Sequence, residues 1–126
     1  MKKAVLLACL LFVISCKKES EETFGQPNPT EVSQTPEQLG KSIFEGKGNC
    51  VACHKINEKL VGPSVQDIAK IYKAQNGDIV SFLKDDAKPI VDPTQYEVMK
   101  TNFALTKAMS EEELKGLEAY IYSNSK

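Results

Sequence analysis

The sequence predicts a small all-α domain, and three features of its 126 residues support this fold class. Thr35 and Ser110 each start a capping box, with glutamine or glutamate at the third helical position and apolar residues at helical spacing behind it. Ser64 offers a third helix start. No part of the sequence shows the regular alternation of apolar and polar residues that predicts a half-buried strand.

The composition fits one soluble domain, with 41% hydrophobic residues, 26% charged residues and a net charge of −1. The chain is too short for a large multidomain enzyme. All 16 basic residues are lysines, so the chain lacks the guanidinium groups that recognition of phosphates and base edges favours. We therefore expect no nucleic-acid partner.

Residues 1–15 are predicted to be a lipoprotein signal peptide. Two lysines precede an uninterrupted apolar run over residues 4–14. As a helix this run would span about 16 Å, well short of the roughly 30 Å hydrocarbon core, so we do not expect a transmembrane helix. Val13-Ile14-Ser15-Cys16 resembles the bacterial lipobox, where cleavage precedes a cysteine that receives a lipid. Plain secretion and an uncleaved anchor are the alternatives. A lipoprotein and a secreted protein would both lie outside the cytoplasm.

Residues 16–35 are predicted to form a flexible linker that carries the lipid on Cys16. They are polar, contain prolines and hold few hydrophobic residues, so they cannot bury a core. More than one acyl chain on the cysteine would hold the protein stably at a membrane surface. The folded domain is then expected to cover residues 36–126.

Within this domain the sequence predicts four helices, over residues 36–45, 65–76, 78–84 and 111–123. Residues 85–93 contain two prolines and no regular period, which predicts a loop. The helices are short and the chain contains no tryptophan, so its own side chains fill only a modest core. We therefore expect a further group to occupy the middle of the domain.

Cys50-Val51-Ala52-Cys53-His54 matches the C-x-x-C-H signature of covalent haem attachment. On a helical turn, two thiols at this spacing can reach the two vinyl groups on one porphyrin edge, and His54 can then place an imidazole nitrogen at the iron. A redox C-x-x-C motif belongs in an α/β context, and a structural zinc site needs a fourth ligand. A disulfide over so short a loop leaves the histidine unexplained. We therefore predict one haem c on Cys50 and Cys53, with His54 as an iron ligand.

Over roughly residues 35–123 the chain resembles the class I cytochromes c. This family places a glycine and an aromatic residue on its first helix, then C-x-x-C-H, a Gly-Pro loop, a methionine near the carboxyl end and a closing helix. The matching residues are Gly40, Phe44, Cys50 to His54, Gly62-Pro63 and the helix that follows Ser110. The resemblance implies a small cytochrome c fold, with helices packed around one covalently bound haem.

The resemblance also implies two contacts. The first and last helices cross closely in this family, which would make Gly40 a contact point beside Tyr120. The carbonyl group of the loop proline, here Pro63, would fix the imidazole of His54. The chain departs from the family in lacking tryptophan and arginine, so lysine, tyrosine, asparagine or backbone groups would meet the haem propionates.

The sixth iron ligand is expected to be a methionine, either Met99 or Met109. Met109 directly precedes the Ser110 cap, where an apolar residue commonly packs as a hydrophobic staple. Met99 lies between the predicted loop and the last helix, which is where the family places its thioether. We therefore predict Met99 as the ligand. The alternatives are Met109, or a Met99 that only fills the core.

Ligation by His54 and Met99 would leave no open position on the iron, so the sequence predicts a one-electron carrier of a respiratory chain and not an enzyme. We expect a monomer, tethered to a membrane outside the cytoplasm, that exchanges electrons with redox partner proteins. One alternative is a five-coordinate haem enzyme or gas sensor, although His54 is the only histidine and no second one could act as a distal acid or base. Another is a haem-bearing subunit of a larger oxidoreductase.

Lys47, Lys55, Lys59 and Lys100 flank the expected haem edge. They could steer an acidic partner toward the haem. The alternative, which we favour, is that they are separate solvated lysines without a shared function.

Overall fold

The computed structural model of the chain describes residues 34–125, so the predicted signal peptide and Cys16 lie outside the described residues, as does most of the linker. Every regular element within residues 34–125 is helical, which confirms the all-α class. The elements are α1 (Pro36–Glu45), a 3-10 turn (Cys50–Ala52), α2 (Val65–Gln75), α3 (Ile79–Leu83), a 3-10 turn (Pro93–Gln95), α4 (Tyr96–Lys100), α5 (Phe103–Thr106) and α6 (Glu111–Ser123). None of the helices in this part of the chain is long and apolar enough to cross a membrane.

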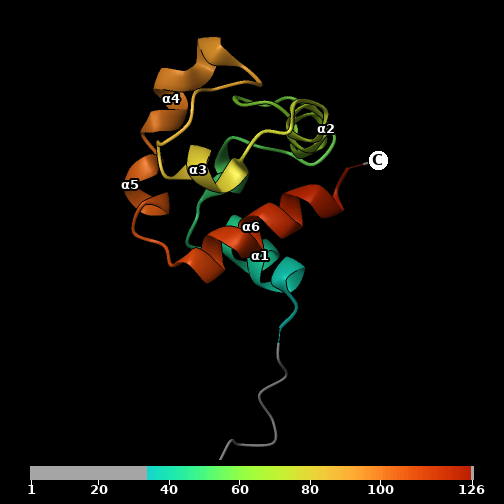
Figure 1. Cartoon of the computed structure of the whole chain (residues 1–126), viewed down its shortest axis with the longest axis vertical. Coiled ribbons are helices and arrows are strands. Elements are labelled where there is room, and N and C mark those ends of the chain that lie inside the picture. The colour runs from blue at the N-terminus through green and yellow to red at the C-terminus, as the bar shows by residue number, and fades with distance from the viewer. Residues whose placement is uncertain (1–33, 126) are drawn as a thin grey trace, which may run out of the picture. The chain divides into compact units, whose positions relative to one another are not determined.

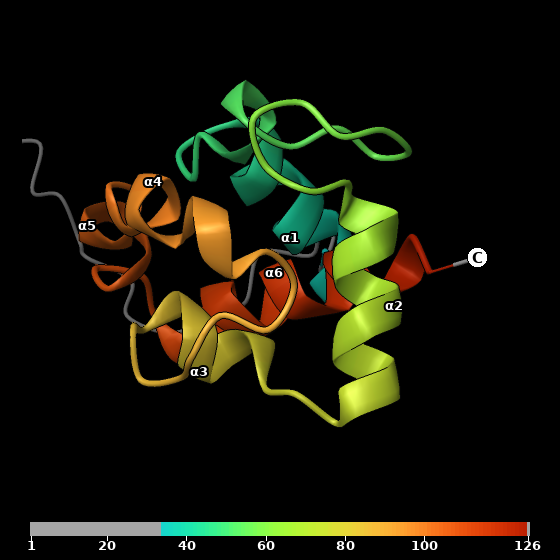
Figure 2. The same ribbon diagram turned by 90° about the horizontal axis from the view of Figure 1, so that it is seen from above.

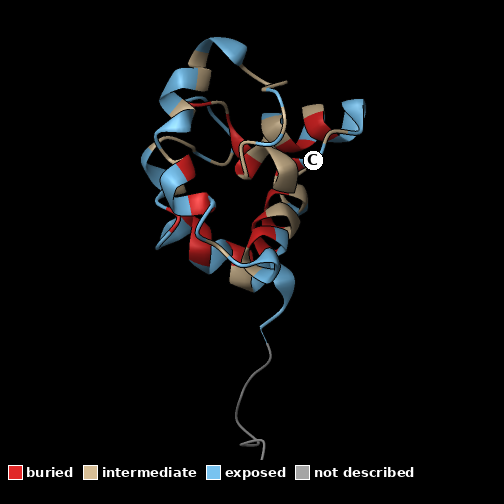
Figure 3. Ribbon diagram, turned by 60° about the vertical axis from the view of Figure 1, so that its left-hand side comes forward, coloured by how far each residue is buried: buried red, intermediate tan, exposed pale blue. Residues whose placement is uncertain are grey.

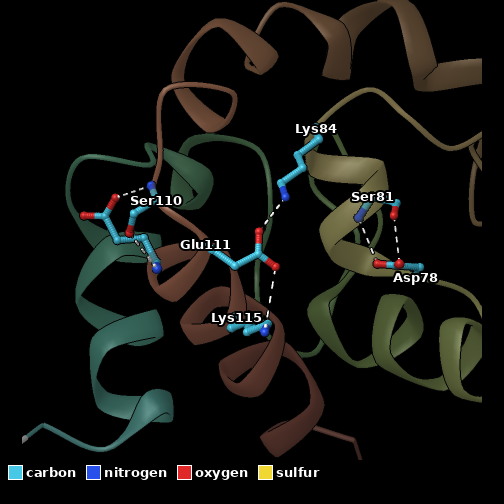
Figure 4. Close-up of polar contacts among 7 residues, drawn as sticks. Asp78, Ser81, Lys84, Ser110, Glu111 and Lys115 are labelled. Carbon is cyan, nitrogen blue, oxygen red and sulfur yellow. Dashed lines mark hydrogen bonds and ion pairs between the residues drawn. The ribbon is translucent and has the colours of Figure 1, made fainter.

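The predicted capping boxes begin the first and last helices. Thr35 Oγ1 accepts a hydrogen bond from Gln38 N at 3.3 Å, and Thr35 N donates to Gln38 Oε1 at 3.0 Å. Ser110 and Glu113 form the same reciprocal pair at α6, with distances of 3.2 and 2.9 Å (Figure 4). These bonds satisfy backbone N–H groups that the first turn of a helix leaves without partners, and so they fix where α1 and α6 begin.

The two middle helices are also capped, α2 by the predicted Ser64 and α3 by Asp78, which the sequence predicts to lie inside the helix. Ser64 Oγ accepts a bond from a backbone N–H in the first turn of α2 at 3.0 Å. Asp78 Oδ1 accepts from Ser81 N at 2.8 Å at the start of α3. At the other end of α3, Lys84 donates to Glu111 at 2.5 Å, which links α3 to the start of α6 (Figure 4).

Helices α1 and α6 cross in close contact, and the crossing forms the lower part of the domain in Figure 1. A Cβ atom on Gly40 would overlap the carbonyl oxygen of Gly116 and lie 2.8 Å from the Cβ of Tyr120. The ring centroids of Phe44 and Tyr120 are 5.3 Å apart beside this contact. The contact expected between Gly40 and the region of Tyr120 is therefore present, and Gly116 is its second glycine.

The buried residues lie on the faces of the helices that point toward one another (Figure 3). Thr106 is fully buried, and its hydroxyl donates to the carbonyl oxygen of Leu83 at 2.6 Å, which joins α5 to the end of α3. The buried hydrophobic residues are Ile43, Phe44, Val65, Ala69, Tyr72, Ile79, Leu83, Phe103, Leu114, Leu117, Tyr120 and Ile121. Every described helix except α4 contributes a buried residue, and α4 contributes Met99, which is partly buried against this core.

The sequence predicts no helix between residues 94 and 109, whereas the structure has α4 and α5 there. Both helices are very short and neither has a side-chain cap, so the usual start signals are missing. Their positions depend instead on aromatic packing: the ring of Phe103 lies 5.4 Å from that of Phe82 and 6.1 Å from that of Tyr96, centroid to centroid. Contacts with residues distant in the sequence therefore decide this region.

Candidate functional site

The described helices surround a cavity that is lined by residues of α1, α2, α3, α4 and α6 and of the loops between them. In Figure 2, α4 lies on the left, α3 below and α2 on the right, and α1 and α6 lie near the centre of the view. The empty volume of the cavity is about 1210 Å³, part of which is open to solvent. Its wall is mostly aliphatic and aromatic, with Phe44, Ile68, Tyr72, Phe82 and Ile90 among its residues. A cavity of this kind suits a large and mainly apolar group.

Three predicted site residues, Cys50, Cys53 and His54, lie together on the cavity wall. Asn49 has a left-handed φ of 52°, which leads the chain into the 3-10 turn Cys50–Ala52. The backbone N–H groups of Cys53 and His54 both donate to the Cys50 carbonyl, at 3.1 and 2.9 Å. Both thiols are free, and burial raises the pKa of the Cys50 thiol to about 11. The turn therefore presents two thiols and one imidazole to the same apolar cavity.

The imidazole of His54 is held from behind by the Gly62-Pro63 loop. Nδ1 of His54 lies 2.7 Å from the carbonyl oxygen of Pro63, and since a carbonyl only accepts, Nδ1 carries the proton. This contact leaves Nε2 as the nitrogen with a free lone pair. A Cβ atom on Gly62 would lie 2.9 Å from Nδ1 and 3.0 Å from Nε2, so only glycine leaves room for the ring. This steric role of Gly62 was not part of the sequence prediction.

The two candidate methionines occupy different surroundings. Met99 lines the cavity from α4. Both methionines are partly buried against the hydrophobic core, but Met109 is absent from the described residues that line the cavity. The structure therefore brings Met99, and not Met109, to the cavity of Cys50, Cys53 and His54.

The cavity also has polar residues that sequence analysis did not assign to the site: Asn49, Asp92, Gln95, Thr101 and Asn102. Asn102 Nδ2 donates to the carbonyl oxygen of Gly48 at 3.1 Å and joins the end of α4 to the turn before Cys50. The turn sequence around Gly48 and Asn49 is a signal that could have identified Asn49. No local signal identifies Asn102, because its partner lies 54 residues away in the sequence.

The four lysines near the site in sequence are all in ion pairs. Lys55 Nζ lies 2.7 Å from Glu58, Lys59 Nζ lies 2.9 Å from Asp92 and Lys100 Nζ lies 3.4 Å from Glu97. Lys47 pairs with Glu113. The positive charge of these side chains is therefore balanced locally, which weakens the case for a basic patch that steers an acidic partner.

Comparison with known proteins gives a family match and several relatives. The cytochrome c family model matches residues 37–125. Cytochrome c-551 of Pseudomonas denitrificans is 45% identical over 49 residues, which are 39% of this chain and 57% of that protein. Cytochrome c-552 of Nitrosomonas europaea is 43% identical over 42 residues, 33% of this chain and 40% of that protein. Cytochrome c-551 of Pseudomonas aeruginosa is 35% identical over 54 residues, 40% of this chain and 51% of that protein. The chain thus spans about half the length of the curated relatives it matches.

The family match covers most of the chain and extends from α1 to α6, so it includes the Cys50–His54 turn and the helices around the cavity. Membership implies one covalently bound haem c, and the two free thiols of this turn provide its attachment chemistry. From its fold, its motif and its matched length, this chain belongs to the cytochrome c family.

Proposed function

We propose that this protein is a one-electron carrier of a respiratory chain, a mono-haem c-type cytochrome with His54 and Met99 as axial ligands. The observation that carries the proposal is that one apolar cavity is lined by an oriented imidazole and by a methionine thioether. Two thiols lie on the same wall, so the donor set matches a covalently attached haem. The iron of that haem supplies the chemistry, because it takes up and releases one electron.

The chain's own residues set the conditions for that chemistry. Cys50 and Cys53 would form the two thioether bonds, and the Pro63 carbonyl would hold the His54 ring with Nε2 available to the iron. The soft sulfur of Met99 would favour the ferrous state, and the apolar wall would disfavour the extra positive charge of the ferric state. Both effects raise the reduction potential.

The surroundings of the cavity favour a carrier over an enzyme. With His54 and Met99 both bound to it, the iron would have no open position for oxygen or peroxide. Among the described residues that line the cavity, Asp92 is the only carboxylate. It is paired with Lys59 and accepts a hydrogen bond from Thr94 at 2.5 Å, so it is not free to act as a general acid or base.

We further propose that residues 1–15 are a signal peptide, that Cys16 carries a lipid and that residues 16–35 tether the domain of residues 36–126 to a membrane outside the cytoplasm. Support comes from the charged and hydrophobic regions of the amino end and from the lipobox-like residues before Cys16. The carrier would act as a monomer that meets its redox partner proteins from this anchor. We expect Cys16→Ser to move the protein to the soluble fraction or to leave the uncleaved precursor, whereas normal processing with unchanged membrane fractionation would refute lipidation.

Absorption spectra of the purified protein test the carrier proposal. We expect a low-spin ferric protein with a weak near-infrared sulfur-to-iron band, and a ferrous protein that does not bind carbon monoxide rapidly. The intact mass should exceed that of the polypeptide by one haem that survives acid extraction. A high-spin ferric spectrum with rapid carbon monoxide binding would instead indicate the five-coordinate enzyme or sensor.

A further inference from the structure

The segment that carries Met99 contributes no fully buried residue to the hydrophobic core, although Met99 is partly buried against that core and the ring of Tyr96 packs on Phe82 and Phe103. We call residues 92–102, which comprise the 3-10 turn Pro93–Gln95, α4 and the residues on either side, the methionine segment. Neither the turn nor α4 contains a buried residue. A segment with few buried apolar contacts opens locally at low cost while the rest of a protein stays folded. The contacts that hold this segment therefore matter for the position of Met99.

The opposite ligand lies on a segment with tight backbone contacts. We call residues 54–63, from His54 to Pro63, the histidine loop. His54 and Lys59 form an antiparallel backbone bridge, and Gly62 N donates to the Cys53 carbonyl at 2.9 Å. Together with the contact between His54 Nδ1 and the Pro63 carbonyl, these bonds fix Lys59 relative to the imidazole.

One ion pair joins the two segments directly. Lys59 Nζ lies 2.9 Å from Asp92 Oδ2, although the two residues are 33 positions apart. The Asp92 side chain is only 18% exposed, whereas that of Lys59 is 59% exposed. Asp92 is also the first residue of the methionine segment: its Oδ1 accepts from the Thr94 hydroxyl at 2.5 Å, and its carbonyl accepts from Gln95 N at 3.1 Å. The pair therefore acts where the methionine segment begins.

We propose that the ion pair between Lys59 and Asp92 is a clasp that holds the methionine segment against the histidine loop and so slows the departure of the Met99 sulfur from the iron. Lys59 and Asp92 are positioning residues, because they act on the iron only through Met99. The inference rests on the proposed ligation by His54 and Met99. It adds that the lifetime of the methionine bond is controlled by an ion pair outside the ligand set.

Exogenous imidazole tests the clasp in the haem-loaded ferric protein. An imidazole nitrogen can bind the iron only after the Met99 sulfur leaves, with no change in oxidation state, so the observed rate should level off at high imidazole at the rate of sulfur departure. We expect Lys59→Gln and Asp92→Asn each to raise this limiting rate about two- to fivefold, the range that corresponds to an ion pair with one exposed partner. Asparagine keeps an oxygen for the Thr94 hydroxyl, so Asp92→Asn removes the charge and leaves the turn capped.

A matched control separates the clasp from a general effect of charge. Lys55 pairs with Glu58 at 2.7 Å within the histidine loop and does not reach the methionine segment. Lys55→Gln removes the same charge and should leave the limiting rate unchanged. The double variant Lys59→Gln, Asp92→Asn should match the single variants, because each already breaks the same pair. Higher salt should raise the limiting rate of the unmodified protein more than that of Lys59→Gln.

Two results would overturn the clasp. The first is that the limiting rates of Lys59→Gln and Asp92→Asn equal that of the unmodified protein. The second is that Lys55→Gln raises the limiting rate as much as these two variants do. Far-ultraviolet circular dichroism melting of all variants should coincide, which shows that the change is local. Failure of the underlying function has a different signature. If the unmodified ferric protein lacks the near-infrared band and its imidazole rate rises without levelling off, Met99 is not a ligand, and the clasp is refuted together with the proposed ligation.

Discussion

At the scale of single residues, the two methionines have separable roles. We expect Met99→Ala to abolish the near-infrared band of the ferric protein, lower the reduction potential and allow the ferrous protein to bind carbon monoxide, because alanine supplies no sulfur to the iron. We expect Met109→Ala to keep the band and to lower the free energy of unfolding by about 2 kcal/mol, the low end for a methionine in a core, since Met109 is only half-buried. Near-infrared spectra and denaturant unfolding of both variants check this prediction.

The reverse pattern would correct the ligand assignment. If Met109→Ala removes the band and Met99→Ala keeps it, Met109 is the ligand and the carrier function stands. The sequence favours Met99, because Met109 directly precedes the Ser110 cap, but both methionines precede the last helix and the placement of Met99 on the cavity wall is visible only in the fold. The family resemblance implies the contact between Pro63 and His54, but not the steric role of Gly62, since that role depends on how the loop folds back onto the imidazole ring.

At the scale of secondary-structure elements, the predictable helices are those whose starts are encoded locally. Thr35, Ser64, Asp78 and Ser110 each accept a bond from their own first turn, and all four helix starts could be predicted from the sequence. Helices α4 and α5 have no such cap and depend on aromatic contacts with Phe82. Gly116 was missed for a similar reason, because its role is visible only when α1 and α6 cross.

The crossing of α1 and α6 gives a prediction for Gly40. Gly40→Ala should lower the free energy of unfolding by about 1–3 kcal/mol, because its methyl group would overlap the Gly116 carbonyl. This loss would appear although alanine favours an isolated helix by about 1 kcal/mol over glycine. Ser42→Ala, on the exposed side of the same helix, is the control and should change stability by less than about 0.5 kcal/mol. Equal stability of the two variants in denaturant unfolding would contradict close packing at the crossing.

At the scale of the whole molecule, the large cavity implies that folding depends on the haem. The helices line a space of about 1210 Å³, part of which is open to solvent, that the chain's own side chains do not fill. We expect the double variant Cys50→Ala, Cys53→Ala to be largely unfolded, because it cannot retain the group that fills this space. Far-ultraviolet circular dichroism during thermal melting checks this expectation. A cooperative melt with a native-like midpoint would show that the polypeptide core is sufficient by itself.

The charge distribution of the whole molecule gives a further prediction about how it meets other redox centres. Because Lys47, Lys55, Lys59 and Lys100 are all paired with carboxylates, the protein should present little net charge to an approaching reagent. Steered association can gain about ten- to a thousandfold in rate and loses this gain as salt is added. We expect the second-order rate of oxidation by ferricyanide to change less than about threefold between low and high ionic strength.

Removing acidic partners should produce the salt dependence that the unmodified protein lacks. Glu58→Gln and Glu97→Gln release Lys55 and Lys100 from their ion pairs without changing either lysine. Combined in one variant, they should raise the rate with the ferricyanide anion at low salt and make that rate fall as salt is added. Glu45→Gln is the matched control, because it removes a carboxylate that pairs with Lys41 on α1. If the oxidation rate of the unmodified protein already falls tenfold as salt is added, the lysines act as a steering patch despite their ion pairs. If Glu45→Gln changes the rate as much as the double variant does, total charge decides the rate and local pairing does not.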